Sequence, residues 1–283
     1  MSAQREETAR KLSRPLVSIV TPVLNGAKYL EECVNSVVSQ DYPRIEHIFV
    51  DGGSTDATME MLSAYAQKYP GRVRVISEPG TGPGEAWNRG LKIAKGEIFG
   101  CLGSDDICEP GAIEAVVEFL RSSPDAHFVH GHCDFINEQG EVIGKHRVNG
   151  FKLRNYINSP KHIATPSAFY KRDVMEKIGW LDTSGNDFDV IIRMAREFRI
   201  YQIEKVLSRV RLRPNSAFNQ MDFQKRQEKF RNTYLISRQY GGSAFSGIAM
   251  SYYISLVFSW LHLQSHFMPI RNLVHKLRRI PGP

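Results

Sequence analysis

Residues 96–113, GEIFGCLGSDDICEPGAI, place two adjacent carboxylates directly after an apolar run. The run Ile98–Leu102 has the length and composition of a buried strand, and Gly103 ends it. Asp105 and Asp106 follow, and Pro110 then begins a predicted helix. One face of that helix is apolar and consists of Ile113, Val116, Val117 and Leu120. Because two acids side by side repel each other, the stretch predicts a site where a ligand or cation neutralises them.

The alternation of strand and helix extends N-terminally from this stretch. Four short apolar runs have the composition of buried strands, at 16–23, 46–50, 72–77 and 97–102. Three segments with a helical spacing of apolar residues lie between them, at 28–40, 54–69 and 84–96. The second of these is expected to begin at a cap formed by Ser54 or Thr55. This order predicts an α/β fold with a mostly parallel sheet covered by helices.

The chain after Arg121 has a mixed pattern. Two strands joined by a turn are predicted within 127–148, helices within 173–182 and 186–198, and one or two strands within 201–212. The segment between Arg238 and Arg271 contains no Lys, Arg, Asp or Glu. Its residues 244–263 are long enough to span a bilayer, although serines and a glycine dilute them. Three interpretations stay open: a buried helix, an interfacial amphipathic helix, or a marginal transmembrane helix.

The net charge of +7 over 283 residues fits three kinds of partner: nucleic acid, an anionic membrane surface, or phosphorylated substrates. Basic residues gather within 205–238 and 271–279, on both sides of the uncharged segment. Basic and aromatic residues are not interleaved on the predicted loops, which argues against nucleic acid. We therefore expect an anionic membrane surface as a partner, where a lipid-linked acceptor would be presented.

The N-terminus and the cysteines indicate the cellular compartment. Residues 1–15 are polar and contain no apolar stretch, so we expect a loose tail rather than a secretory signal. The four cysteines form no CxxC pair, and Cys33 and Cys101 lie in apolar runs, as buried free thiols do. These features predict a cytoplasmic protein, associated with the inner face of the cell membrane.

Polar residues and glycines follow the predicted strands at their carboxyl ends, where open parallel sheets bind ligands. The first three strands are followed by Thr21, Pro22, Asn25, Asp51, Gly53, Ser54 and Glu78. Ser104, Asp105 and Asp106 follow the fourth. Carboxylate oxygens suit Mg²⁺ or Mn²⁺, whose other ligands commonly come from substrate phosphates. Taken alone, Ser-Asp-Asp is more typical of a helix cap, but Asp51 and the glycines beside it favour a metal site.

These motifs, in this order, resemble one known family. The segments VSIVTPVLNGAKYLEECVNSVVSQDYPRIEHIFVDGGSTDAT (17–58) and SEPGTGPGEAWNRGLKIAKGEIFGCLGSDD (77–106) are similar to the nucleotide-binding half of family-two glycosyltransferases. These are inverting enzymes with the GT-A fold. The resemblance implies a tail at 1–14 and a GT-A domain at 15–214, divided into a nucleotide-sugar half (15–121) and an acceptor or catalytic half (122–214). A C-terminal helical, membrane-associating region at 215–283 would follow.

The resemblance also implies roles for single residues. Contacts with the nucleotide sugar are implied for Thr21, Pro22, Asn25, Asp51, Gly53, Ser54, Glu78, Arg89 and Asp105. Asp51 stands where an acid reads the base, usually uracil, and Asp105 stands where an acid contacts the ribose. Asp106 matches the metal-binding acid of the DxD-type motif, in which Ser104 replaces the first acid.

A second motif lies in the segment GNDFDVIIRMA, residues 185–195, which is similar to the family's ED-type motif. Asn186 replaces the usual Glu, and Asp187 stands at the position of the general base. Asp189 is the alternative candidate, and His162 is implied as an acceptor contact. Taken alone, Asp187 is also explained as a first-turn acid that complements the helix dipole.

The resemblance therefore implies a metal-assisted, inverting transfer of a sugar from a nucleotide diphosphate, UDP being expected, to a hydroxyl of a glycan or lipid-linked acceptor. Gly80, Gly84 and Glu85 depart from the family's common residues beside the donor sugar, so the sugar stays open. No Q-x-x-R-W sequence follows, which argues against a processive synthase. Two alternatives remain: a noncatalytic sugar-nucleotide-binding scaffold, and a sugar nucleotidyltransferase, which would need a more glycine-rich first loop.

Overall fold

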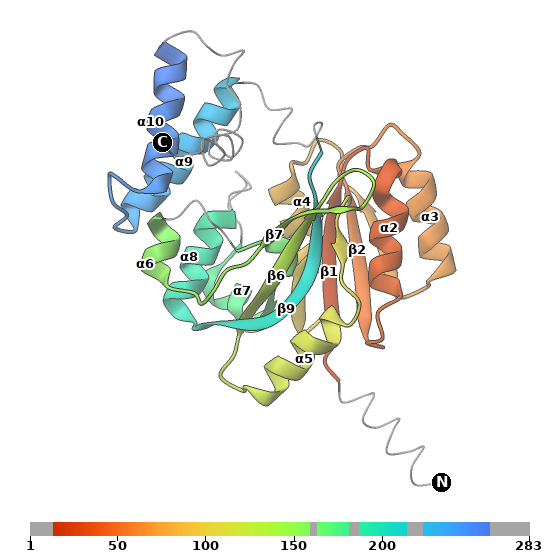
Figure 1. Cartoon of the computed structure of the whole chain (residues 1–283). Helices are drawn as coiled ribbons and strands as arrows, with labels where there is room; N and C mark the ends of the chain where they lie inside the picture. The colour runs from red at the N-terminus through yellow and green to blue at the C-terminus, as the bar shows by residue number, and fades with distance from the viewer. Residues whose placement is uncertain (1–13, 159–162, 181–186, 214–222, 261–283) are drawn as a thin grey trace. The chain divides into compact units, whose positions relative to one another are not determined.

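The computed structural model describes residues 14–158, 163–180, 187–213 and 223–260 (Figure 1). The chain divides into two units: residues 1–151 with 162–213, and residues 152–161 with 214–283. The second unit thus takes in residues 152–161 in addition to the C-terminal region. His162 and Asn186, which the sequence marked as acceptor-side and motif residues, lie outside the described residues.

In the described part of the first unit, nine strands form one mixed sheet. They are β1 (Val17–Val23), β2 (Ile45–Asp51), β3 (Val73–Ser77), β4 (Ile98–Cys101), β5 (Ile107–Cys108), β6 (Phe128–Ile136), β7 (Val142–His146), β8 (Ala168–Lys171) and β9 (Ile200–Arg211). Their order is β3-β2-β1-β4-β8-β6-β9-β5, and β7 pairs with β6. Strands β1 to β4 are parallel, whereas β8 runs antiparallel to both β4 and β6. The predicted α/β fold, with a parallel front half and a mixed second half, is confirmed.

Helices cover the sheet, and α2 and α3 lie side by side (Figure 1). The helices of the first unit are α2 (Ala27–Val38), α3 (Thr58–Lys68), α4 (Pro83–Ile93), α5 (Ala112–Ser122), α7 (Arg172–Ile178) and α8 (Asp187–Glu197), with the 3₁₀ turn η1 (Thr165–Ser167). Because α2 and α4 pack on opposite faces of β1, that strand is buried along nearly its whole length. A strand buried on both faces is expected to be mostly apolar, and β1 is so except for Ser18 and Thr21, which are buried polar residues.

The close packing of α4 on β1 depends on a glycine. A Cβ added to Gly90 would lie 2.3 Å from Val20 Cγ1 and 3.2 Å from Val50 Cγ2. Only a residue without a side chain allows the helix to approach the two strands this closely. This packing sets the positions of the strand ends, and with them the positions of the loops that follow.

Helix α3 begins later than predicted, at Thr58 instead of after a cap at Ser54 or Thr55. The side chain of Asp56 accepts the N–H of Thr58 at 3.0 Å and thereby satisfies the helix start. Ser54 Oγ accepts the N–H of Asn25 at 2.8 Å instead. The prediction was wrong because Ser54 bridges two loops that are distant in sequence.

The described residues of the second unit form three helices, α6 (Leu153–Asn158), α9 (Phe223–Gln239) and α10 (Gly247–Trp260). The hydroxyl of Ser237 donates to the carbonyl of Ile157 at 2.8 Å, and Asn158 Oδ1 accepts the N–H of Ser243 at 2.6 Å. Residues 247–260 of the uncharged segment form α10. Within the ranges that the structure describes, no helix has both the length and the apolar character needed to cross a membrane.

Two buried histidines predict a loss of stability in mild acid. Burial lowers the pKa of His47 to about 3 and that of His130 to about 4. Both titrate near 6.5 when unfolded, so the unfolded state binds more protons and stability falls as the pH drops below that value. We expect each histidine to lower the free energy of unfolding by about 2 kcal/mol at pH 5 relative to pH 7.5. Urea unfolding at the two pH values measures this difference, and His130→Gln should reduce it by about 2 kcal/mol. An unchanged difference in that variant would contradict the argument.

Candidate active site

The loops after β1 and β2 are joined at the carboxyl edge of the sheet. The N–H of Asn25 donates to Ser54 Oγ at 2.8 Å, and Asn25 Oδ1 accepts the N–H of Thr55 at 2.8 Å. Asn25 has a φ of 50°, a left-handed conformation that asparagine adopts more readily than most residues. The structure therefore brings Asn25 and Ser54, two of the predicted donor contacts, into one surface.

Asp51, the last residue of β2, orders the loop that follows it. Its carboxylate is 1% exposed and accepts the N–H groups of Gly53 at 3.0 Å and of Ser54 at 3.1 Å. Gly53 has a φ of 101°, and a Cβ there would lie 3.3 Å from Pro79 Cα. The N–H of Glu78 donates to the carbonyl of Asp51 at 2.7 Å, so the loop after β3 lies against the loop after β2. A nucleobase that donates a hydrogen bond to Asp51 would have to share carboxylate oxygens that already accept the N–H groups of Gly53 and Ser54.

Thr21 lies apart from these residues. It has no exposed surface, and its Oγ1 lies 2.8 Å from His47 Nε2 in the core. Pro22, the next residue, is half-buried near the end of β1. The side chain of Thr21 is therefore a core contact between β1 and β2.

Glu78 and Arg89 meet beside the start of α4. Arg89 Nη1 lies 3.9 Å from Glu78 Oε1, and Arg89 Nη2 lies 3.2 Å from Glu85 Oε1. The guanidinium is nearly half exposed, at 46%. A partly exposed guanidinium at a ligand-binding sheet edge has the charge and donor geometry to bind a phosphate.

The two acids follow β4 in a tight turn. Asp106 is buried, and its Oδ1 accepts the N–H of Arg211 at 3.0 Å. Burial, and next the neighbouring charge of Asp105, raise the pKa of Asp106 to about 7. A Cβ added to Gly103 would lie 2.5 Å from Asp106 Oδ2 and 3.2 Å from Asp105 Oδ1. The two carboxylates thus converge on the open side of Gly103, where a bound cation would relieve their repulsion.

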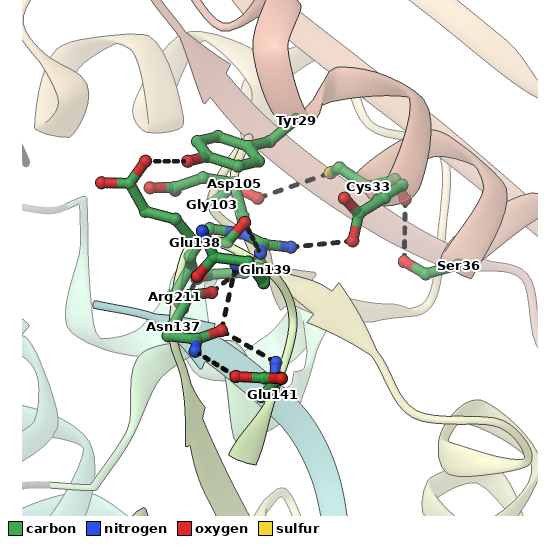
Figure 2. Close-up of polar contacts among 12 residues, drawn as sticks. Tyr29, Cys33, Ser36, Gly103, Asp105, Asn137, Glu138, Gln139, Glu141 and Arg211 are labelled. Atoms are coloured by element: carbon green, nitrogen blue, oxygen red, sulfur yellow. Dashed lines mark hydrogen bonds and ion pairs between the residues drawn. The ribbon is translucent and has the colours of Figure 1, made fainter. Parts of the chain in front are cut away.

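Arg211, at the end of β9, holds the turn that carries the acid pair (Figure 2). Its side chain has no exposed surface; Nε donates to the carbonyl of Asp105 at 3.0 Å and Nη2 to Glu32 Oε2 at 2.8 Å. Nη1 donates to the carbonyls of Asn137 and Glu138 at 3.0 and 3.1 Å. One buried guanidinium therefore ties the acid turn to α2 and to the β6–β7 hairpin.

Arg213 pairs directly with one of the two acids. Its Nε lies 2.5 Å from Asp105 Oδ2, and Arg209 pairs with Glu109. The sequence interpretation missed these site residues, because it assigned all basic residues of 205–238 to a membrane surface. The available signal was the spacing of Arg209, Arg211 and Arg213, which places alternate arginines at the end of a predicted strand.

Asp187 begins α8 and lies near the acid pair. Thr165 Oγ1 donates to Asp187 Oδ2 at 2.5 Å. Burial raises the pKa of the Cys101 thiol at the end of β4, and the charges of Asp106 and Asp187 add to the increase. Thr165 lies in η1, which packs against β4 and precedes Phe169, the residue opposite Gly100 of β4, so its hydrogen bond holds Asp187 near the carboxyl end of β4.

Asp189, the alternative base candidate, has a different environment. Its Oδ2 accepts a hydrogen bond from Arg193 Nε at 2.8 Å, one turn along α8. Asp189 is half-buried, whereas Asp187 is exposed. Of the two carboxylates, Asp187 is therefore the one more accessible to solvent.

Asp106, with Asp105 beside it, is the residue that fits a divalent metal. Neither at the acid pair nor elsewhere do the described ranges contain a group of three or more His, Cys, Asp or Glu side chains suited to a metal. A metal at the acid pair would therefore need other ligands in addition to Asp105 and Asp106. Donor phosphates and waters are the ligands that Mg²⁺ commonly takes in such sites.

Comparison with known proteins identifies relatives of the chain. Residues 18–179 match the model of Glycosyl transferase family 2. An uncharacterized glycosyltransferase of Nostoc is 29% identical over 174 residues, which cover 59% of this chain and 54% of that protein. Chondroitin synthase of Escherichia coli is 28% identical over 231 residues, which cover 78% of this chain and 33% of the synthase. The chain thus spans about half the length of the first relative and a third of the second.

Solved structures of glycosyltransferases show the same fold. TarS of S. aureus in complex with UDP-GlcNAc is 20% identical, with a TM-score of 0.60 over 78% of this chain and 66% of the TarS chain. The mannosyltransferase PcManGT of Pyrobaculum calidifontis, in complex with GDP-Man and Mn²⁺, is 18% identical, with a TM-score of 0.61 over 90% of this chain and 76% of its own. The sequence match to the family model covers more than half of the chain, including the acid pair and the loops beside it. This protein therefore belongs to glycosyl transferase family 2.

Proposed function

We propose that this family-two glycosyltransferase transfers a sugar with inversion of its anomeric configuration. The donor is a nucleotide-diphosphate sugar, UDP-linked, and the acceptor is a hydroxyl of a glycan or of a lipid-linked acceptor. One observation carries the proposal: Thr165, in the turn η1 that packs against β4, holds Asp187 near the carboxyl end of the strand from which the chain continues to Asp106. An acid for the leaving group and a base for the acceptor would thus share the edge at which open sheets bind ligands.

Asp187 is the proposed general base. A carboxylate within hydrogen-bond reach of the acceptor hydroxyl takes its proton as the oxygen attacks the anomeric carbon. The attack comes from the side opposite the leaving diphosphate, so a single displacement inverts the anomeric configuration. His162, which lies outside the described residues, is the proposed acceptor contact.

Asp106 would hold the divalent metal, Mg²⁺ or Mn²⁺, which supplies positive charge to the departing diphosphate. Asp105 would contact the ribose, and Arg89, with its partly exposed guanidinium, would add positive charge near the phosphates. Arg211 has no exposed surface, so its part is to keep the acid turn in place. The presence of Mn²⁺ in the PcManGT structure supports a metal in this chain.

The nucleotide is proposed to bind the joined loops after β1, β2 and β3. The residues assigned to it there are Thr21, Pro22, Asn25, Asp51, Gly53, Ser54 and Glu78. For Thr21 the contact would involve the backbone, since its hydroxyl is engaged by His47. TarS structures hold UDP-GlcNAc and UDP, which supports a uridine nucleotide here.

Isothermal titration of UDP into the purified chain, with and without Mn²⁺, tests the donor site. We expect binding that Mn²⁺ tightens about ten-fold or more, equal to 1.4 kcal/mol. GDP and dTDP are matched controls for the base and should bind more weakly. UDP-sugars, UDP-GlcNAc first, are then combined with p-nitrophenyl glycosides, and the anomeric proton of the product reports inversion by NMR.

The same experiments distinguish the two alternatives. A noncatalytic scaffold would bind UDP but release none from any UDP-sugar. A nucleotidyltransferase would instead release pyrophosphate from UTP and a sugar 1-phosphate. Absence of binding to UDP, GDP and dTDP would contradict the donor site itself.

We further propose that the protein is cytoplasmic and that its second unit contacts the anionic inner face of the cell membrane. Helix α9 carries five basic residues and one acidic residue. Phe245, in the turn before α10, is 88% exposed, and Met250 of α10 is 50% exposed. Exposed apolar side chains next to a basic helix are typical of proteins that bind membrane surfaces.

Vesicle flotation at low salt tests this contact. We expect the full chain to float with vesicles that contain phosphatidylglycerol, to float less at high salt, and not to float with phosphatidylcholine alone. Phe245→Ser should reduce the bound fraction about two-fold or more. A chain that stays in the soluble fraction under all conditions would contradict the proposal.

A further inference from the structure

We propose that Thr165 is a positioning residue for Asp187, an inference that rests on the proposed function. The hydroxyl of Thr165 donates to Asp187 Oδ2 at 2.5 Å. Asp187 is the first residue of α8 and is exposed, so neighbouring turns of helix do not confine its side chain on every side. A hydrogen bond from a fixed donor is what would orient such a carboxylate.

The turn that carries Thr165 is itself anchored to the sheet. Ser167, two residues later, has no exposed surface. Its Oγ donates to the carbonyl of His132 in β6 at 2.8 Å and lies 2.6 Å from Ser208 Oγ in β9. Two strands thus hold η1 through one buried hydroxyl, and Thr165 is presented from a rigid base.

The strand that follows η1 places the turn beside the acid pair. Strand β8 pairs with β4 so that Phe169 lies opposite Gly100. Ala168 and the turn before it therefore lie next to the carboxyl end of β4, the end from which the chain continues to Asp105 and Asp106. Thr165 thus reaches Asp187 from the same edge at which the donor is proposed to bind.

The hydrogen bond selects which oxygen of the base reacts. Since Thr165 engages Oδ2, we assign the acceptor proton to Asp187 Oδ1. A base acts only when its lone pair lies within reach of the hydroxyl, and a carboxylate that rotates freely spends time in unproductive orientations. The expected role is therefore in the rate of transfer and not in donor affinity.

Thr165→Val, which removes the hydroxyl and keeps the shape, tests this role. With UDP-GlcNAc as the first donor and p-nitrophenyl glycosides as acceptors, we expect kcat to fall about 10–100-fold. KM for the donor and the affinity for UDP should change less than about two-fold, a split that a structural defect would not produce. Thr165→Ser restores the hydroxyl and should keep kcat within about three-fold of the wild type.

Thr233→Val is the matched control. It makes the same atomic change in α9, where the hydroxyl donates to the carbonyl of Lys229 at 2.9 Å, and it should leave all three quantities unchanged. If Thr165→Val fails to fold, as thermal unfolding would show, Thr165→Ala replaces it in every comparison.

A double-mutant comparison separates this inference from the proposed function. If Thr165 acts through Asp187, adding Thr165→Val to the Asp187→Asn variant should lower kcat no further. Wild-type kcat in Thr165→Val, or an equal loss in both backgrounds, would overturn the positioning role and leave the base in place. Wild-type kcat in Asp187→Asn would overturn the assignment of the base to Asp187, and with it this inference.

Discussion

Replacement of Asp187 by asparagine is expected to lower kcat about 10²–10⁴-fold, with little change in the affinity for UDP. An amide cannot take the proton of the acceptor hydroxyl. Its oxygen still accepts the hydrogen bond that Thr165 donates, so the start of α8 keeps its geometry. Release of UDP from UDP-sugars in the presence of glycoside acceptors measures kcat, and titration with UDP measures the affinity.

Asp189→Asn is the matched comparison on the same helix. Its carboxylate is bonded to Arg193, so we expect kcat to stay within about five-fold of the wild type. The reverse result, an inactive Asp189→Asn and an active Asp187→Asn, would assign the base to Asp189. Loss of UDP binding in Asp187→Asn would indicate that this carboxylate shapes the donor site instead.

Replacement of Asp106 by asparagine is expected to separate function from stability. Without this ligand, the affinity for UDP in the presence of Mn²⁺ should fall about ten-fold or more, to its value without metal. The unfolding temperature of the metal-free protein should nevertheless rise, because the variant no longer buries a charge beside Asp105. A gain of about 1 kcal/mol would raise the unfolding temperature by about 2–4 °C.

Asp41→Asn is the control for this substitution, because Asp41 is exposed in the turn before β2. It should change neither the affinity nor the unfolding temperature. Mn²⁺-dependent UDP binding that survives in Asp106→Asn would show that Asp106 is not the metal ligand. A lower unfolding temperature in that variant would show that the buried carboxylate stabilises the turn.

The parallel half of the sheet could be predicted because its signals are local. Apolar runs such as Ile98–Leu102 and the helical spacing that starts at Ile113 are set by neighbours within one element. The start of α3 could not be predicted, since Ser54 is engaged by Asn25 from another loop. A cap and a bridge between loops use the same residue types, and only the neighbour across the fold distinguishes them.

For the candidate site, the edge of the sheet at which the acids lie could be predicted, but the contacts of individual side chains could not. Strand topology alone placed Asp51 and Asp106 at one edge, because the carboxyl ends of parallel strands meet there. The direction of the Thr21 side chain depended on His47 in the next strand. Arg211 became a site residue only because β9 runs back beside the acid turn.

The sequence by itself determined the α/β fold, the family and the acids that follow its strands, because these depend on local patterns and on spaced motifs. The tertiary structure decided which of those side chains have free oxygens for a ligand and which are held by other parts of the chain. It also joined Thr165 to Asp187 and Arg213 to Asp105, residues that are 22 and 108 positions apart. Hydrogen bonds of this kind depend on distance in space, which no local pattern of residues specifies.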